Sequence, residues 1–151
     1  MRIVIQRVKR VDLTADGRPF DSMKDGILAL VGIKSGDNNE KIMQYMLDKL
    51  VNLRIFEDEQ GKMNLSVVDK GYSLFLVSNF TLYGDCRHGR RPGYSSGAPV
   101  EEARTIFDTF TAYAKEHAPV PVHTGLFQAD MQIETCLDGP VTLLLDSDKA
   151  F

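Results

Sequence analysis

Three polar side chains, Ser78, Asn79 and Thr81, stand where an apolar stretch of the sequence ends, in the motif SNFT. The ends of buried strands often carry functional side chains, and a threonine hydroxyl can act as a nucleophile. Such a nucleophile needs a general base within hydrogen-bond reach, and the sequence offers only His88 nearby. The motif therefore indicates either a catalytic strand end or a polar strand end whose hydroxyl groups satisfy neighbouring backbone groups.

A second candidate is the glycine-rich loop CRHGRRPGYSSG at residues 86–97, which holds Arg87, Arg90 and Arg91 beside a single acid, Asp85. Loops of this length without periodicity are usually functional or disordered. The net charge of −3 argues against a protein that coats nucleic acid nonspecifically, but a local basic cluster can still bind phosphates. A solvated loop with no ligand is the alternative.

The third candidate is the dipeptide Gly139-Pro140, which precedes the apolar run VTLLLD. Glycine allows the backbone to approach another body closely, whereas proline fixes φ and removes a hydrogen-bond donor. The pair fits either a backbone recognition element or a tight turn into the last strand.

The elements that position these groups follow from the apolar pattern. Strands are expected at residues 2–8, 26–33, 72–82, 131–137 and 140–146, with a hairpin turn at Asp16-Gly17. Apolar residues at spacings of three and four predict helices over 41–56 and from Pro99 to residue 118. Residues 1–151 are therefore expected to form a single α+β domain, with a mostly antiparallel sheet or barrel and two main helices packed on it.

Composition narrows the classes of protein. The longest apolar run is too short for a membrane span, and the N-terminal stretch is typical of a first strand and not of a signal peptide. Cys86 and Cys136 do not form a disulfide pattern, so a cytosolic location is the default. We expect no metal and no cofactor, because the sequence lacks a four-ligand zinc pattern, a P-loop and a dinucleotide fingerprint.

Five stretches together resemble the D-aminoacyl-tRNA (D-tyrosyl-tRNA) deacylase family, in order and in spacing, over nearly the whole chain. They are RIF with DEQGKMNLSV at 54–67, VSNFTL at 77–82, GRRPGYSSGA at 89–98, TGLFQADMQ at 124–132 and DGPVT at 138–142. The resemblance implies a cytosolic homodimer that hydrolyses the ester joining a D-amino acid, or glycine, to the 3′ end of tRNA. This activity keeps D-amino acids out of translation.

The resemblance also assigns roles. The family's Ser-Gln-x-Thr motif falls on residues 78–81, which makes Ser78, Asn79, Phe80 and Thr81 the expected catalytic residues. Its Gly-cis-Pro motif falls on Gly139 and Pro140, which are expected to cross the dimer and screen the chirality of the amino acid. Arg87, Arg90 and Arg91 are then expected to bind the phosphates of the tRNA acceptor end.

The sequence departs from the family pattern twice. Asn79 stands where the family usually has glutamine, and Leu137 stands where the motif around Gly139-Pro140 begins with asparagine. Two reaction routes are open: Thr81 attacks the ester, or Thr81 and the backbone around Phe80 position the ester and donate to its oxyanion. The second is favoured, because no base accompanies Thr81 in sequence. The alternative function is a non-catalytic module that binds an RNA end or an amino acid.

Overall fold

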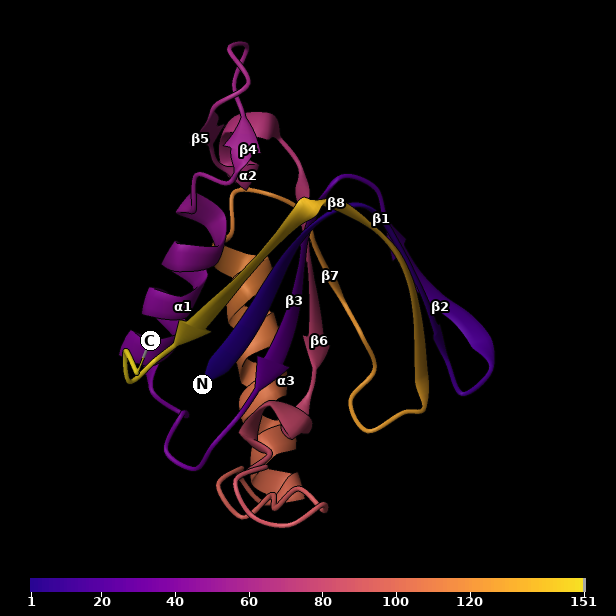
Figure 1. Ribbon diagram of the computed structural model, residues 1–151, viewed down its shortest axis with the longest axis vertical. Helices are drawn as coiled ribbons and strands as arrows, with labels where there is room; N and C mark the ends of the chain where they lie inside the picture. The colour runs from indigo at the N-terminus through magenta and orange to yellow at the C-terminus, as the bar shows by residue number, and fades with distance from the viewer. Residues whose placement is uncertain (151) are drawn as a thin grey trace.

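A computed structural model describes residues 1–150 (Figure 1). The strands are β1 (Arg2–Ala15), β2 (Arg18–Met23), β3 (Gly26–Gly32), β4 (Phe56–Glu57), β5 (Met63–Leu65), β6 (Ser73–Ser78), β7 (Val122–Thr124) and β8 (Met131–Asp146). The helices are α1 (Glu40–Asn52), α2 (Val67–Lys70) and α3 (Val100–His117), together with the 3₁₀ turn η1 (Phe80–Tyr83).

The main sheet runs in the order β2-β1-β3-β6-β7, and β8 pairs along the other edge of β1. The pairs made by β1 are antiparallel, whereas β3–β6 and β6–β7 are parallel. The sheet curls until its two ends meet, because His123 Nδ1 on β7 lies 3.0 Å from Asp21 Oδ1 on β2. The α+β class and the mostly antiparallel, barrel-like sheet with two main helices expected from the sequence are confirmed, and the structure adds that the mixed sheet is nearly closed.

Helices α1 and α3 cover one face of the sheet, on the far side in the view of Figure 1. Their apolar stripes pack on β3 and β6, whose residues are almost all buried, as the continuous apolar run at 26–33 predicts. A second apolar cluster, which includes Leu13, Phe75 and Val77, fills the inside of the curled sheet. The two cores fix the shared strand β6, and β6 carries the SNFT motif at its end.

Two boundaries differ from the prediction. The stretches 131–137 and 140–146 form one continuous strand, β8, because both pair with β1 and only residues 138–141 leave the ladder. The segment 72–82 is not all strand: β6 ends at Ser78 and the chain turns into η1. Leu82 N–H bonds back to Asn79 O at 3.3 Å, so local turn bonds replace the sheet ladder there.

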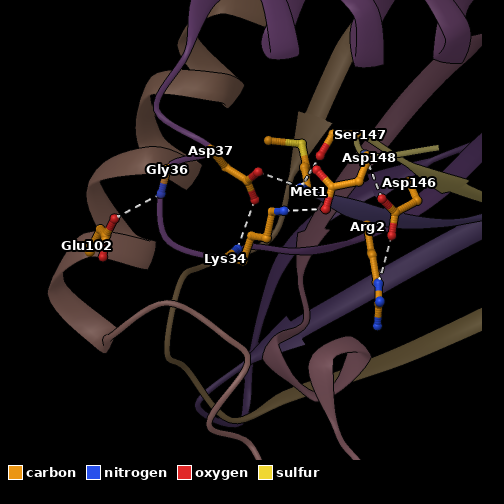
Figure 2. A network of polar contacts seen from close by, with 9 residues as sticks. All are labelled: Met1, Arg2, Lys34, Gly36, Asp37, Glu102, Asp146, Ser147 and Asp148. Carbon is orange, nitrogen blue, oxygen red and sulfur yellow. Dashed lines mark hydrogen bonds and ion pairs between the residues drawn. The ribbon is translucent and has the colours of Figure 1, made fainter. Parts of the chain in front are cut away.

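A polar network ties the two ends of the described chain together (Figure 2). The Met1 ammonium donates to Asp37 Oδ1 and to Ser147 Oγ, both at 2.6 Å, and is fully buried. Arg2 Nε donates to Asp146 Oδ2 at 2.9 Å, which fastens the start of β1 to the end of β8. This network anchors the end of the sheet against which η1 lies.

Candidate active site

The SNFT motif forms a compact turn at the end of β6. Asn79 N–H donates to Val31 O at 2.7 Å, so β3 holds the backbone of the motif in place. The Thr81 hydroxyl donates to Asn79 Oδ1 at 2.5 Å, and both side chains belong to the same turn. The acceptor of the Thr81 proton is therefore a neutral amide oxygen, and not the imidazole or carboxylate that a threonine nucleophile would require.

The turn also begins with backbone hydrogen-bond donors. The N–H groups of Phe80 and Thr81 stand at the start of η1, where the first donors of a helix have no partner within the helix. Both residues are exposed, and the Phe80 side chain keeps 65% of its accessible surface. The turn can therefore present two backbone N–H groups to an external ester carbonyl, and the Thr81 hydroxyl can join them by turning its one proton away from Asn79 Oδ1.

The basic loop follows η1 directly and is ordered by its own contacts. Asp85 and Gly93 exchange two backbone hydrogen bonds, of 2.7 and 2.9 Å, which close residues 85–93 into a hairpin. Arg87 binds the Asp85 carboxylate through Nε at 2.8 Å and Nη2 at 2.7 Å, and these bonds hold the pKa of Asp85 well below its usual range. Arg90 and Arg91 are exposed, and neither has an ion-pair partner within residues 1–150.

An open hollow of about 690 Å³ adjoins this loop and the start of β1. Each of its three cations already has an acidic partner: Arg2 with Asp146, Lys34 with Asp148, and Arg87 with Asp85. Figure 2 shows the first two of these pairs. Free positive charge beside η1 therefore comes from Arg90 and Arg91 and not from the walls of the hollow.

The dipeptide Gly139-Pro140 lies in a bulge of β8. Residues 138–141, named the Gly-Pro bulge below, stand opposite the single residue Arg7 of β1. The Gly139-Pro140 peptide bond is cis, as the resemblance implies, and both residues are exposed. Gly139 has φ of +129°, and a Cβ there would lie 2.8 Å from Val141 N, so the site requires glycine.

The side chain of Arg7 supports the Gly-Pro bulge, a role that the sequence did not predict. This side chain is buried; Nε donates to Asp138 O at 3.2 Å and Nη1 donates to Ile55 O at 2.7 Å. Nε also lies 3.0 Å from the Asp138 carboxylate. A signal was present, since Arg7 continues the alternation of the buried residues Ile3 and Ile5, where a cation is unexpected.

The two halves of the expected site are far apart within the chain. Arg2 Nη1 contacts Leu82 O in η1, whereas Arg7 lies under the Gly-Pro bulge. These two arginines are five residues apart on β1, which corresponds to roughly 17 Å at the rise of a β-strand. The structure thus brings Ser78, Asn79, Phe80 and Thr81 together and leaves Gly139 and Pro140 at a distance from them.

Within residues 1–150, no three His, Cys, Asp or Glu side chains converge in the way that metal ligands do. In the same part of the chain, no helix combines the length and the apolar character needed to cross a membrane.

Comparisons with known proteins agree with these motifs. A family model described as D-Tyr-tRNA(Tyr) deacylase matches residues 4–146. The chain is 50% identical to a D-aminoacyl-tRNA deacylase of Kosmotoga olearia and 49% identical to one of Clostridioides difficile, in each case over 100% of both chains.

Solved structures show the same fold. One, described as a c-Myc DNA unwinding element binding protein, has 36% identity and a TM-score of 0.88, covering 97% of this chain and 98% of its own. Another, described as a probable eukaryotic D-amino acid tRNA deacylase, has a TM-score of 0.80 at 13% identity, covering 95% of this chain and 97% of its own, and is similar in fold alone. The match over residues 4–146, with relatives at 50% identity over the full length, establishes that this chain belongs to the D-Tyr-tRNA(Tyr) deacylase family.

Proposed function

We propose that this chain is an ester hydrolase that cleaves the bond between a D-amino acid, or glycine, and the 3′ end of tRNA. Water is consumed, and the products are the free amino acid and a tRNA with a free 3′-terminal ribose hydroxyl. The relatives named D-aminoacyl-tRNA deacylase support the activity. The observation that carries the proposal is the Gly-Pro bulge, an exposed backbone element held by the buried Arg7.

The Gly-Pro bulge suits the reading of chirality. An enzyme that accepts any D-residue cannot recognise the side chain and must read the arrangement of groups around Cα. Backbone atoms have no rotamers, and Arg7 fixes those of the bulge through Asp138. An L-residue would direct a group into this wall, which is discrimination by repulsion.

The chemistry follows from the SNFT turn. Because Thr81 donates to a neutral amide oxygen, its hydroxyl has no base to activate it as a nucleophile. The backbone N–H of Phe80 instead orients the ester and stabilises its oxyanion, and the Thr81 hydroxyl assists once its proton turns from Asn79 Oδ1 to the ester. Ser78 and Asn79 shape the turn. Water attacks the ester carbonyl with help from the 2′-hydroxyl of the terminal ribose, and the 3′-oxygen leaves.

A homodimer completes this site. The Gly-Pro bulge lies roughly 17 Å from η1 along β1 of its own chain, so it serves the turn of a second copy better than its own. Strand β8 supports this arrangement, because it pairs only with β1 within residues 1–150 and exposes Leu137, Leu143 and Leu144. Exposed leucines on an unpaired edge strand are typical of a surface that a partner covers.

The remaining residues are assigned from the chemistry of the tRNA substrate. Arg90 and Arg91 bind phosphates of the acceptor end, and Arg87 contributes less because Asp85 already binds it. The enzyme acts in the cytosol, where aminoacyl-tRNA is used. No observation on residues 1–150 favours a non-catalytic binding module over an enzyme.

The direct test is to incubate catalytic amounts of the protein with D-aminoacyl-tRNA and with its L-counterpart, and to measure ester loss. We expect turnover of the D-ester and protection of the L-ester. Equal rates for both esters would contradict the chiral screen, and no turnover of either would contradict the enzyme.

A further inference from the structure

Two exposed aromatic rings lie beside the catalytic turn and have no part in the function proposed above. Phe80 keeps 65% of its accessible surface and Tyr94 keeps 44%. Their ring centroids are 5.1 Å apart and their planes are inclined by 63°, so the two rings form an edge-to-face pair. Because the two exposed rings are in contact, they form a contiguous apolar patch, and such patches mark sites for a ligand or partner.

The Tyr94 ring is held in place by the loop around it. Gly93, the preceding residue, exchanges two hydrogen bonds with Asp85, and Gly97 N–H bonds back to Tyr94 O at 3.2 Å. A Cβ on Gly84 would lie 3.1 Å from Tyr94 Cε1, so the bare backbone of Gly84 provides the space for the ring. Tyr94 is therefore fixed by contacts on both sides, although its ring faces solvent.

Positive charge accompanies the aromatic pair. Tyr94 follows the hairpin that carries Arg90 and Arg91, and neither arginine is paired within residues 1–150. An aromatic surface combined with unpaired arginines is the usual arrangement for single-stranded nucleic acid, whose bases stack on the rings while cations follow the phosphates.

We infer that Phe80 and Tyr94 form a stacking site for the unpaired bases at the 3′ end of the tRNA substrate. The inference rests on the proposed function, because the ester bond lies at this same unpaired end and Phe80 adjoins Thr81. Every base has a π-face, so stacking accepts any sequence. The site would therefore give affinity for the unpaired end without reading which tRNA carries it.

The test compares two RNAs and two substitutions. Binding is measured for an intact tRNA and for the same tRNA without its unpaired 3′ nucleotides. We expect the wild-type protein to bind the intact tRNA about tenfold more tightly than the truncated one. Tyr94→Leu keeps an apolar side chain but removes the π-face, and we expect it to remove most of this difference. Tyr94→Phe keeps the ring and should bind as the wild type does.

A fluorescent base analogue in the unpaired end provides a second readout. Its emission should be quenched on binding to the wild type and to Tyr94→Phe, and not on binding to Tyr94→Leu. Phe80→Leu should also weaken this quenching, which keeps the test valid if Tyr94→Leu disturbs the loop. Equal binding of both RNAs by the wild type, or unchanged quenching in both leucine variants, would overturn the inference.

The alternative occupant of the aromatic pair is a second copy of the chain. In that case Tyr94→Leu would change the monomer–dimer equilibrium and leave the binding preference for the intact tRNA unaltered, which also overturns the inference. Hydrolysis of D-aminoacyl-tRNA, measured in parallel, separates the two proposals. Turnover without a preference for the unpaired end rejects only the stacking site, whereas that preference without turnover rejects the enzyme.

Discussion

Arg7 Nε donates to the backbone carbonyl oxygen of Asp138 at 3.2 Å and lies 3.0 Å from the carboxylate of the same residue. One buried guanidinium thus holds both the main chain and the side chain of the residue that precedes Gly139-Pro140. No other residue of β1 stands opposite the Gly-Pro bulge, because the register passes from Gln6 opposite Thr142 to Val8 opposite Leu137. Lys9 Nζ also lies 3.5 Å from the Asp138 carboxylate, so Arg7 shares the support of that side chain but holds the backbone carbonyl of Asp138.

Replacement of Arg7 should weaken the discrimination between D- and L-esters more than it slows ester hydrolysis itself. We expect Arg7→Met to lower the free energy of unfolding by roughly 3 kcal/mol, near the lower limit for a buried charge pair because Asp138 is partly solvated. The ratio of D- to L-ester hydrolysis should fall, because the wall near Cα loses its support. Denaturant unfolding and the two hydrolysis rates measure these effects. Asp138→Asn, which keeps the backbone acceptor, should be milder, and an unchanged D/L ratio in Arg7→Met would contradict this role.

Gly139 tests the Gly-Pro bulge from its exposed side. Gly139→Ala places a Cβ 2.8 Å from Val141 N at a φ of +129°, so we expect a loss of about 1–3 kcal/mol of stability. Activity on the D-ester should fall as well, because the added methyl displaces the screening backbone. Gly61→Ala is the matched control, since Gly61 has φ of +73° but open space around it. That variant should lose stability and keep its D-ester activity.

Much of this arrangement could be predicted from the sequence, because local patterns decide it. Apolar periodicity places α1 and α3, and the continuous run at 26–33 places β3. Motif spacing identifies residues 78–81 and Gly139-Pro140, whose roles stay predictions. The hydrogen bond from Thr81 to Asn79 is also local, being formed within a single turn.

The remainder depends on contacts between distant parts of the chain. Arg7 and Asp138 are far apart in sequence, so the bond that supports the Gly-Pro bulge appears only once β1 and β8 pair. The continuity of β8 across residues 138–141 also required that pairing, since Gly139-Pro140 alone suggests a break between two strands. The hydrogen bonds that Arg87 donates to Asp85 are short-range, but the sequence could not distinguish this pairing from phosphate binding by a free arginine.

The arginines of the 85–93 hairpin should contribute unequally to the salt dependence of tRNA binding. Arg90→Ala combined with Arg91→Ala removes two unpaired cations, and the magnitude of the negative slope of log K against log salt should decrease by about 1.4–1.8. Arg87→Ala should change the slope by less than the amount expected for one phosphate contact. The reason is that the ionised Asp85 already neutralises the charge of Arg87. Titrations at several salt concentrations measure the slopes. Equal slopes in the wild type and the double variant would exclude these arginines from the RNA interface.

The exposed leucines of β8 test the homodimer. Leu143 and Leu144 keep 38% and 55% of their accessible surface, and aspartate at both positions should convert the proposed dimer to monomer. Hydrolysis should be lost together with dimerisation, because the Gly-Pro bulge of the partner no longer reaches η1. Sedimentation reports the mass and ester loss the activity. Met63→Asp changes an equally exposed side chain on β5, outside β8, and should leave both unchanged. An active monomer would show that one chain completes its own site.

Thr81 distinguishes the two reaction routes. If its hydroxyl positions the ester and donates to the oxyanion, Thr81→Ala should lower kcat by about 10²–10³-fold, the usual effect of removing one such donor, and leave measurable turnover. Thr81→Ser should retain most activity, because serine also has a hydroxyl that can donate to the ester. This role requires no general base. A single-turnover experiment with a labelled D-amino acid adds a readout that rate alone does not give. If water attacks the carbonyl directly, no label should remain bound to the protein after acid quenching. The nucleophilic route would be established by a covalent adduct in the wild type that Thr81→Ala abolishes together with all turnover. In that case a general base would have to replace Asn79 Oδ1 as the acceptor of the Thr81 proton.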